Sequence, residues 1–88
     1  MTAKIIETVT AAIPGSKVYA FSPDGTHFQA LVISDRFEEM SLVRQHQMVM
    51  NALKSDFDSD RLHALQLKTF TPQRWEQDRH QYNLEVSQ

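Results

Sequence analysis

The sequence contains no cysteine among its 88 residues. A disulfide framework, a thiol nucleophile and an iron–sulfur cluster held only by this chain's own cysteines are therefore excluded. The sequence also lacks an apolar stretch long enough to span a membrane, and it lacks a charged-then-apolar signal segment at its start. We therefore expect a cytoplasmic protein that does not associate with membranes.

The length and composition fit one small domain. With 88 residues, of which 41% are hydrophobic, the chain can bury a core but has no room for a large pocket. We expect a single domain over residues 1–88, with a loosely held tail after about residue 80. The net charge of −2 argues mildly against strong nonspecific binding to nucleic acid, which depends on many lysine and arginine contacts to phosphate.

Three helices are predicted, over residues 3–13, from Ser41 to about Lys54, and from Thr71 onward. Pro14 and Gly15 end the first helix. Ser41 and Thr71 are suitable N-caps for the other two, and Pro72 can occupy the first helical position without losing a needed hydrogen bond. Trp75 then lies in the first turn of the last helix, where we expect it in the core.

The second helix has an apolar stripe formed by Leu42, Val49 and Leu53. The same stripe takes in His46, so we expect this histidine to be partly buried with its hydrogen bonds satisfied. His80 falls in the tail and is expected to be solvated.

Three strands are predicted, over residues 17–22, 27–34 and 62–70. Turn residues at positions 23–25 join the first two strands into a hairpin. Residues 55–60 are mostly polar and form a loop or a short helical turn. The crossover through the second helix is long enough to place the third strand parallel to the second. The expected order is α-β-β-α-β-α, a small mixed sheet with its helices on one face.

Two of the four histidines begin predicted strands, His27 the second strand and His63 the third. Neighbouring strands lie about 4.8 Å apart, so the two imidazoles could approach one metal centre if the strands are parallel and adjacent. Each could equally be an ordinary strand-end histidine bonded to water or backbone. Two separated histidines are not in themselves a metal motif.

An ordered set of motifs surrounds His63. Phe37, Ser41 and Val43 come before the second helix, then His63-Ala64, Lys68, Thr71-Pro72 and Trp75 follow in that order. Over roughly residues 3 to 79 the chain resembles the BolA family, in which these motifs occur in this sequence. The segment Gly25–Gln29 with Met40-Ser41 resembles the short-loop, IbaG-like branch of that family. The resemblance implies a KH-like (class II) α/β fold, which agrees with the order of elements predicted above.

The resemblance also implies a partner. BolA-like proteins pair with monothiol glutaredoxins of the CGFS type and share a [2Fe–2S] cluster, which a glutaredoxin cysteine and a glutathione thiolate hold from one side. The position of the family's histidine ligand matches His63. A cysteine-free chain can add only imidazole or oxygen ligands, so it must borrow thiolates from a partner. We therefore expect a heterodimer with the cluster shared, and no cluster on the isolated chain.

The second ligand is left open by the sequence. The short hairpin loop offers Ser22, Asp24 and Thr26 besides His27, and among these His27 is the candidate that we place beside His63. An imidazole in place of a thiolate raises the potential of a cluster, as in Rieske centres. Because imidazole ligands also protonate, such a cluster is expected to be lost or transferred more readily in mild acid.

The alternative function is that of a DNA-binding transcriptional regulator. The residues that could form a local basic face are Arg61, Lys68, Arg74 and Arg79. KH domains bind single strands through a Gly-x-x-Gly loop, and Gly15 and Gly25 cannot form one, so we expect only weak DNA binding.

No nucleophile–base pair, phosphate loop or carboxylate pair indicates an enzyme. The oligomeric state, including a homodimer, is left open.

Overall fold

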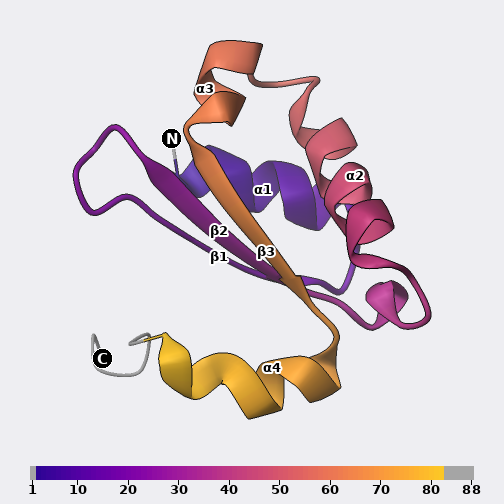
Figure 1. Cartoon of the computed structure of the whole chain (residues 1–88). Coiled ribbons are helices and arrows are strands. Elements are labelled where there is room, and N and C mark those ends of the chain that lie inside the picture. The colour runs from indigo at the N-terminus through magenta and orange to yellow at the C-terminus, as the bar shows by residue number, and fades with distance from the viewer. Residues whose placement is uncertain (1, 83–88) are drawn as a thin grey trace.

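The computed structural model describes residues 2–82. Its centre is a three-stranded mixed sheet with the strand order β1-β2-β3 (Figure 1). The strands are β1 (Lys17–Phe21), β2 (Phe28–Ile33) and β3 (Leu65–Phe70). β1 runs antiparallel to β2, and β2 runs parallel to β3. The predicted hairpin and the predicted parallel pairing are both confirmed.

The helices are α1 (Thr2–Ala12), α2 (Leu42–Leu53), α3 (Ser59–His63) and α4 (Pro72–Asp78). Both predicted caps are present. The hydroxyl of Ser41 accepts a hydrogen bond of 3.2 Å from the N–H of Arg44, and the hydroxyl of Thr71 accepts one of 3.3 Å from the N–H of Arg74. The predicted loose tail begins as a 3-10 turn, Arg79–Gln81, and its residues 83–88 lie outside the described residues.

The prediction that His63 begins the third strand is wrong. His63 is the last residue of α3, and β3 begins at Leu65. The helix starts because the carboxylate of Asp58 accepts a hydrogen bond of 2.9 Å from the N–H of Arg61, which satisfies one of the free donors of the first turn. This local cap decides the conformation of residues 59–63, whose apolar content is too small to specify a strand.

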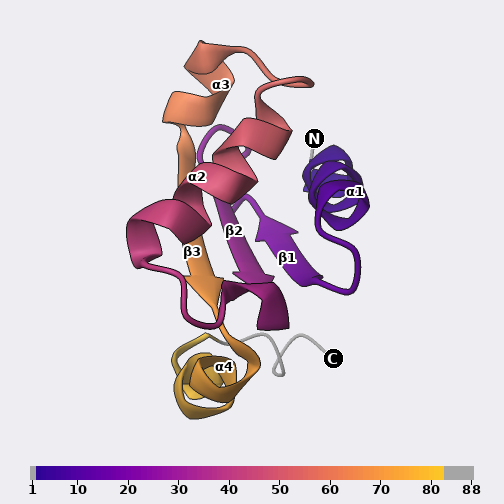
Figure 2. The ribbon, with the colours of Figure 1, turned by 90° about the vertical axis from the view of Figure 1, so that its right-hand side faces the viewer.

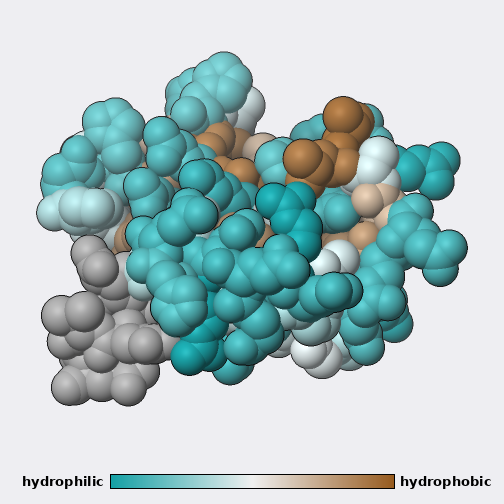
Figure 3. All heavy atoms as spheres, turned by 60° about the horizontal axis from the view of Figure 1, so that its bottom comes forward, coloured by the Kyte–Doolittle hydropathy of each residue, from teal (hydrophilic) through white to brown (hydrophobic). Residues whose placement is uncertain are grey.

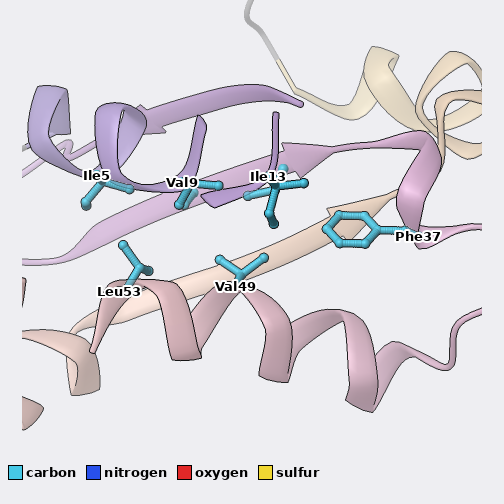
Figure 4. Close-up of a cluster of buried hydrophobic side chains, with 8 residues drawn as sticks. Ile5, Val9, Ile13, Phe37, Val49 and Leu53 are labelled. Carbon is cyan, nitrogen blue, oxygen red and sulfur yellow. The ribbon is translucent and has the colours of Figure 1, made fainter. Parts of the chain in front are cut away.

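Two groups of buried side chains lie on opposite faces of the sheet. Under α1 and α2 the group consists of Ile5, Val9, Ile13, Ala30, Val32, Phe37, Val49 and Leu53 (Figure 4). Leu31 and Ile33 alternate with members of that group along β2 and therefore face the other side, where they pack with Phe70 and Trp75. Continuous apolar sequence in β2 thus signals burial on both faces.

The helix α4 brings Trp75 to that second face, so the prediction that all helices lie on one face is wrong. Figure 2 shows α4 at the end of the sheet opposite to α3. The indole stacks on Tyr19 of β1 with 5.6 Å between ring centroids and meets the edge of Phe70 at 5.2 Å. The predicted core position of Trp75 is confirmed.

The buried stripe of α2 includes Gln45 in place of the predicted Leu42. Val49 and Leu53 are buried as expected, but Leu42 is 53% exposed. Gln45, which lies four residues before Val49, takes the next place on the stripe and is buried. Its side-chain amide donates hydrogen bonds to the carbonyls of Met40 (2.9 Å) and Phe37 (3.3 Å). A glutamine is tolerated there because these partners satisfy its polar atoms.

Candidate metal-binding site

The parallel pairing of β2 and β3 brings two histidines to one end of the sheet. Phe28 pairs with Leu65, and the N–H of Phe28 donates a hydrogen bond of 2.9 Å to the carbonyl of Ala64. In this register His27 lies opposite Ala64, the residue that follows His63, so the two histidines are on neighbouring chain segments at the point where the strands begin. The predicted placement at the same end of the sheet is confirmed, although His63 reaches it from a helix. Metal binding by the pair stays a prediction.

His63 is exposed at the end of α3. The N–H of the following residue, Ala64, donates to the carbonyls of Arg61 and Leu62, which closes the helix. Within residues 2–82 the His63 imidazole makes no hydrogen bond. Its ring nitrogens are therefore available to a ligand that approaches from outside.

The loop before β2 is folded around the carboxylate of Asp24. Its Oδ1 atom accepts hydrogen bonds from the backbone N–H groups of Thr26 (2.9 Å) and His27 (2.8 Å), the pattern of an Asx-turn. Gly25 inside the turn has a φ of +80°, which glycine adopts without steric cost. From the other side, the hydroxyl of Ser22 donates a hydrogen bond of 2.7 Å to the carbonyl of His27. These contacts fix the backbone of His27.

The imidazole of His27 is held by the same aspartate. Nδ1 of His27 lies 2.8 Å from Oδ2 of Asp24, and the histidine side chain is nevertheless 77% exposed. The pKa of the Asp24 carboxyl is held well below its usual range, first by the backbone N–H of His27, then by the imidazole of His27 and the backbone N–H of Thr26. Asp24 is thus a stable anion beside an exposed imidazole.

The donor set fits a shared metal centre and does not fit a self-contained one. Within residues 2–82 there is no cluster of three or more histidine, cysteine, aspartate or glutamate side chains that could hold a metal ion. His27 and His63 can supply two imidazoles, and an iron–sulfur cluster needs four ligands from proteins or thiols. The remaining ligands would have to come from another molecule, which the exposure of both histidines permits.

The other two histidines do not join this site. His46 is half-buried and lines an open groove of about 480 Å³ between α2, β3 and α4. The prediction that His46 is partly buried is confirmed, but within the described part of the chain its imidazole has no hydrogen-bond partner, so the predicted satisfaction is not seen. His80 is exposed in the 3-10 turn after α4, as expected.

The four basic residues Arg61, Lys68, Arg74 and Arg79 do not form one face. Arg61 lies on α3, at the opposite end of β3 from α4. Near α4, Arg74 pairs with Asp78 at 3.5 Å, and Arg79 pairs with Glu76 at 3.6 Å. Figure 3, in which the α4 side comes forward, shows a largely hydrophilic face with apolar surface confined to small areas. Arg74 and Arg79 are thus accompanied by carboxylates, whereas the ammonium of Lys68 lies over the ring of Tyr82, 5.5 Å from its centroid.

Sequence reasoning considered Asp24 only as one possible ligand and missed its contact with His27. The signal was present in the spacing, because an aspartate followed by glycine and then by a histidine three positions after it can close an Asx-turn onto that histidine. Two separate interactions of one carboxylate, with the backbone and with the ring, are visible only in the folded loop.

The described residues include no helix that is both long and apolar enough to cross a membrane.

The sequence pattern of the BolA-like protein family matches residues 6–74. The chain is 38% identical over 58 residues to the acid stress protein IbaG of Escherichia coli K12, covering 66% of this chain and 69% of that protein. It is 35% identical over 52 residues to the DNA-binding transcriptional regulator BolA of Vibrio cholerae, covering 59% of this chain and 48% of that protein.

The fold has close counterparts among solved structures. A BolA protein homologue from Coxiella burnetii superposes with a TM-score of 0.72 at 39% sequence identity, covering 86% of this chain and 96% of that chain. The BolA1 protein of Mus musculus superposes with a TM-score of 0.71 at 28% identity, covering 89% of this chain and 70% of that chain. Sequence and fold agree, and the protein belongs to the BolA-like family.

Proposed function

We propose that this protein is a non-enzymatic partner of a CGFS-type monothiol glutaredoxin and shares with it a glutathione-coordinated [2Fe–2S] cluster. Its work would lie in iron–sulfur trafficking or in iron and redox sensing. The observation that supports this most directly is the placement of two exposed histidines, His27 and His63, at the adjacent starts of β2 and β3. Membership of the BolA-like family supports the choice of partner.

Each residue of the site has a separate task in this proposal. His63 and His27 supply imidazole nitrogens, and the hydrogen bond from Phe28 to Ala64 fixes the spacing of the two chain segments that carry them. The glutaredoxin cysteine and the glutathione thiolate complete the set of four ligands. When bound, the cluster supplies a reversible one-electron couple and a transferable iron–sulfur unit. The exposure of both imidazoles allows the partner to approach without refolding of this chain.

The dependence on a partner follows from the ligand count. The chain has no cysteine, and two neutral imidazoles cannot balance the charge of a ferric cluster as thiolates do. The isolated chain is therefore expected to bind no stable cluster.

The test is anaerobic reconstitution with the purified chain, a CGFS-type glutaredoxin, glutathione, ferric iron and sulfide. We expect a coloured 1:1 heterodimer whose visible circular-dichroism spectrum differs from that of the glutaredoxin reconstituted alone. The chain without glutaredoxin serves as the control and should stay colourless. A stable cluster on the chain alone, or a glutaredoxin spectrum that the chain does not change, would contradict the proposal.

A second candidate is DNA binding, which the relation to the Vibrio cholerae regulator favours. Against it stand the net charge of −2 and the carboxylate partners of Arg74 and Arg79. Both observations support only weak, nonspecific binding that disappears near physiological salt. Fluorescence anisotropy with labelled duplex DNA over a range of salt concentrations separates the candidates, because tight binding to one sequence at physiological salt would place the regulator first.

A further inference from the structure

The loop that carries His27 has several atoms that could bind a metal, and among its side-chain oxygens and ring nitrogens only Nε2 of His27 makes no hydrogen bond within residues 2–82. Both carboxylate oxygens of Asp24 accept hydrogen bonds within the loop, Oδ1 from two backbone N–H groups and Oδ2 from the ring of His27. The hydroxyl of Ser22 is engaged with the carbonyl of His27 at 2.7 Å. The hydroxyl of Thr26 lies 3.3 Å from Nδ1 of His27. Each loop oxygen therefore already has a structural contact.

The contact with Asp24 also determines which nitrogen of His27 carries the proton in the neutral ring. An ionised carboxylate can only accept a hydrogen bond, so Nδ1, at 2.8 Å from Oδ2, must be the donor. The lone pair of a neutral imidazole is then on Nε2. Within residues 2–82 no hydrogen bond reaches that atom, and the side chain is 77% exposed.

We propose that Asp24 is a positioning residue that holds His27 in the Nδ1–H tautomer and presents Nε2 as the second ligand of the shared metal centre. This inference rests on the proposed function and resolves the choice among Ser22, Asp24, Thr26 and His27 that the sequence leaves open. Metal-bound histidines commonly donate their other ring N–H to a carboxylate, which fixes the tautomer and raises the basicity of the ligand nitrogen. The Asp24–His27 pair has this arrangement, with Nδ1 of His27 at 2.8 Å from Oδ2 of Asp24.

The decisive variant is Asp24→Asn. The amide oxygen of asparagine can still accept the backbone N–H groups of Thr26 and His27, so the Asx-turn is retained. Its amide nitrogen is a donor, however, and in place of Oδ2 it would donate to Nδ1 and move the ring proton to Nε2. The matched control is Asp35→Asn, which makes the same charge change at the far end of β2, in the 3-10 turn Asp35–Phe37.

The first readout is made on the free protein and needs no cluster. Long-range ¹H–¹⁵N spectra of the imidazoles, recorded at a pH where the rings are neutral, distinguish the two tautomers. We expect the Nδ1–H tautomer of His27 in the wild-type chain and in Asp35→Asn, and a shift toward the Nε2–H tautomer in Asp24→Asn. An unchanged tautomer in Asp24→Asn would overturn the inference.

The second readout is made on the heterocomplex with glutaredoxin. Loss of a carboxylate behind a histidine ligand typically weakens metal binding by about 10- to 100-fold, so cluster loss should be about 10-fold faster or more in Asp24→Asn, with a changed visible spectrum. Wild-type behaviour of Asp24→Asn, despite a changed tautomer, would overturn the ligand role of Nε2 and leave the proposed function intact. Failure of the wild-type chain to form the coloured complex would instead overturn the proposed function, and the ligand role with it.

Discussion

The hydroxyl of Thr69 on β3 donates a hydrogen bond of 2.7 Å to the side-chain oxygen of Gln45 on α2, and both side chains are buried. This contact joins a helix to the edge strand in the middle of an otherwise apolar interface. The amide of Gln45 continues the network to the carbonyls of Phe37 and Met40. Buried groups that satisfy one another in this way specify a single packing arrangement, because any other would leave them unpaired.

The first prediction concerns this pair. Thr69→Val keeps the shape of the side chain but leaves the buried oxygen of Gln45 without a donor, so the free energy of unfolding should fall by about 1–3 kcal/mol. Urea denaturation followed by far-ultraviolet circular dichroism measures it. Gln47→Leu on the exposed side of α2 is the control, with a change expected within about 0.5 kcal/mol. Equal effects of the two substitutions would show that the buried network contributes nothing.

The second prediction concerns Trp75, which packs among Tyr19, Phe70 and Tyr82. Trp75→Ala should lower the free energy of unfolding by about 3–5 kcal/mol, because it empties the centre of the second buried group. Trp75→Leu fills part of this space and should lose less, which provides a folded variant for measurement. The comparison is Gln73→Ala, an exposed position in the same helix. A loss no greater for Trp75→Ala than for Gln73→Ala would mean that α4 is dispensable for stability.

The third prediction concerns His63. Because this imidazole is exposed, His63→Ala should change the free energy of unfolding by no more than about 0.5 kcal/mol. In the complex with glutaredoxin it should alter the visible spectrum and speed cluster loss, since an iron ligand is removed. His46→Ala is the matched control and should keep the wild-type spectrum, with a small loss of stability from a half-buried site. The assignment fails if His46→Ala changes the spectrum while His63→Ala does not.

The fourth prediction concerns acid and the Asp24 loop in the free protein. The folded-state pKa of the Asp24 carboxyl is lowered, so the loop contacts contribute stability above the ordinary value of 3.8 and lose it as the pH falls through the lower folded-state value. The backbone amide signals of Thr26 and His27 should therefore keep their folded chemical shifts when the pH is lowered to 3.8. A carboxyl titration of Asp24 centred at or above that value, followed by NMR, would contradict this.

The fifth prediction concerns acid and the heterocomplex. Protons compete with iron for imidazole nitrogen but compete far less for low-pKa thiolates. The cluster shared with this chain should be lost faster as the pH falls from neutral to mildly acidic, and faster than the cluster of the glutaredoxin homodimer under the same conditions. Stopped-flow absorbance after a pH jump measures both rates. Equal rates at every pH would argue against imidazole ligation.

The strands, their pairing and most helix limits could be predicted from the sequence because each depends on local chemistry. The hydroxyls of Ser41 and Thr71 cap the first turns of α2 and α4, so these residues predict where the helices start. Gly25 in the same way predicts the hairpin turn. The sequence predicts a loop or a short helical turn over residues 55–60 but does not predict that the helix α3 continues to His63, because one side chain, Asp58, decides it against a weak apolar pattern. Periodicity puts Leu42 on the apolar stripe of α2, but it does not reveal where the helix loses contact with the sheet, and Leu42 is exposed. The burial of Gln45 depends on three partners, two from the loop before α2 and one from β3.

The candidate site was predictable in its residues but not in its geometry. The spacing of the elements placed His27 and His63 at one end of the sheet before the register was known. No periodicity could predict that Asp24 reaches back to the ring of His27, because this depends on the φ of Gly25 and on the closure of a loop. Residues that position a ligand leave a weaker signal than the ligand itself, since many polar loop residues could serve.

The strand β3 separates the two chemically distinct ends of the molecule. His63 precedes its first residue and α4 follows its last, with six residues between Leu65 and Phe70, which corresponds to roughly 20 Å of extended chain. The groove that Lys68 and Arg74 line begins at Leu67, in the middle of β3, and continues to α4, so it does not include the start of the strand beside His63. The histidines and the lining of that groove share no residue, so a substitution at His27 or His63 leaves the side chains of the groove in place.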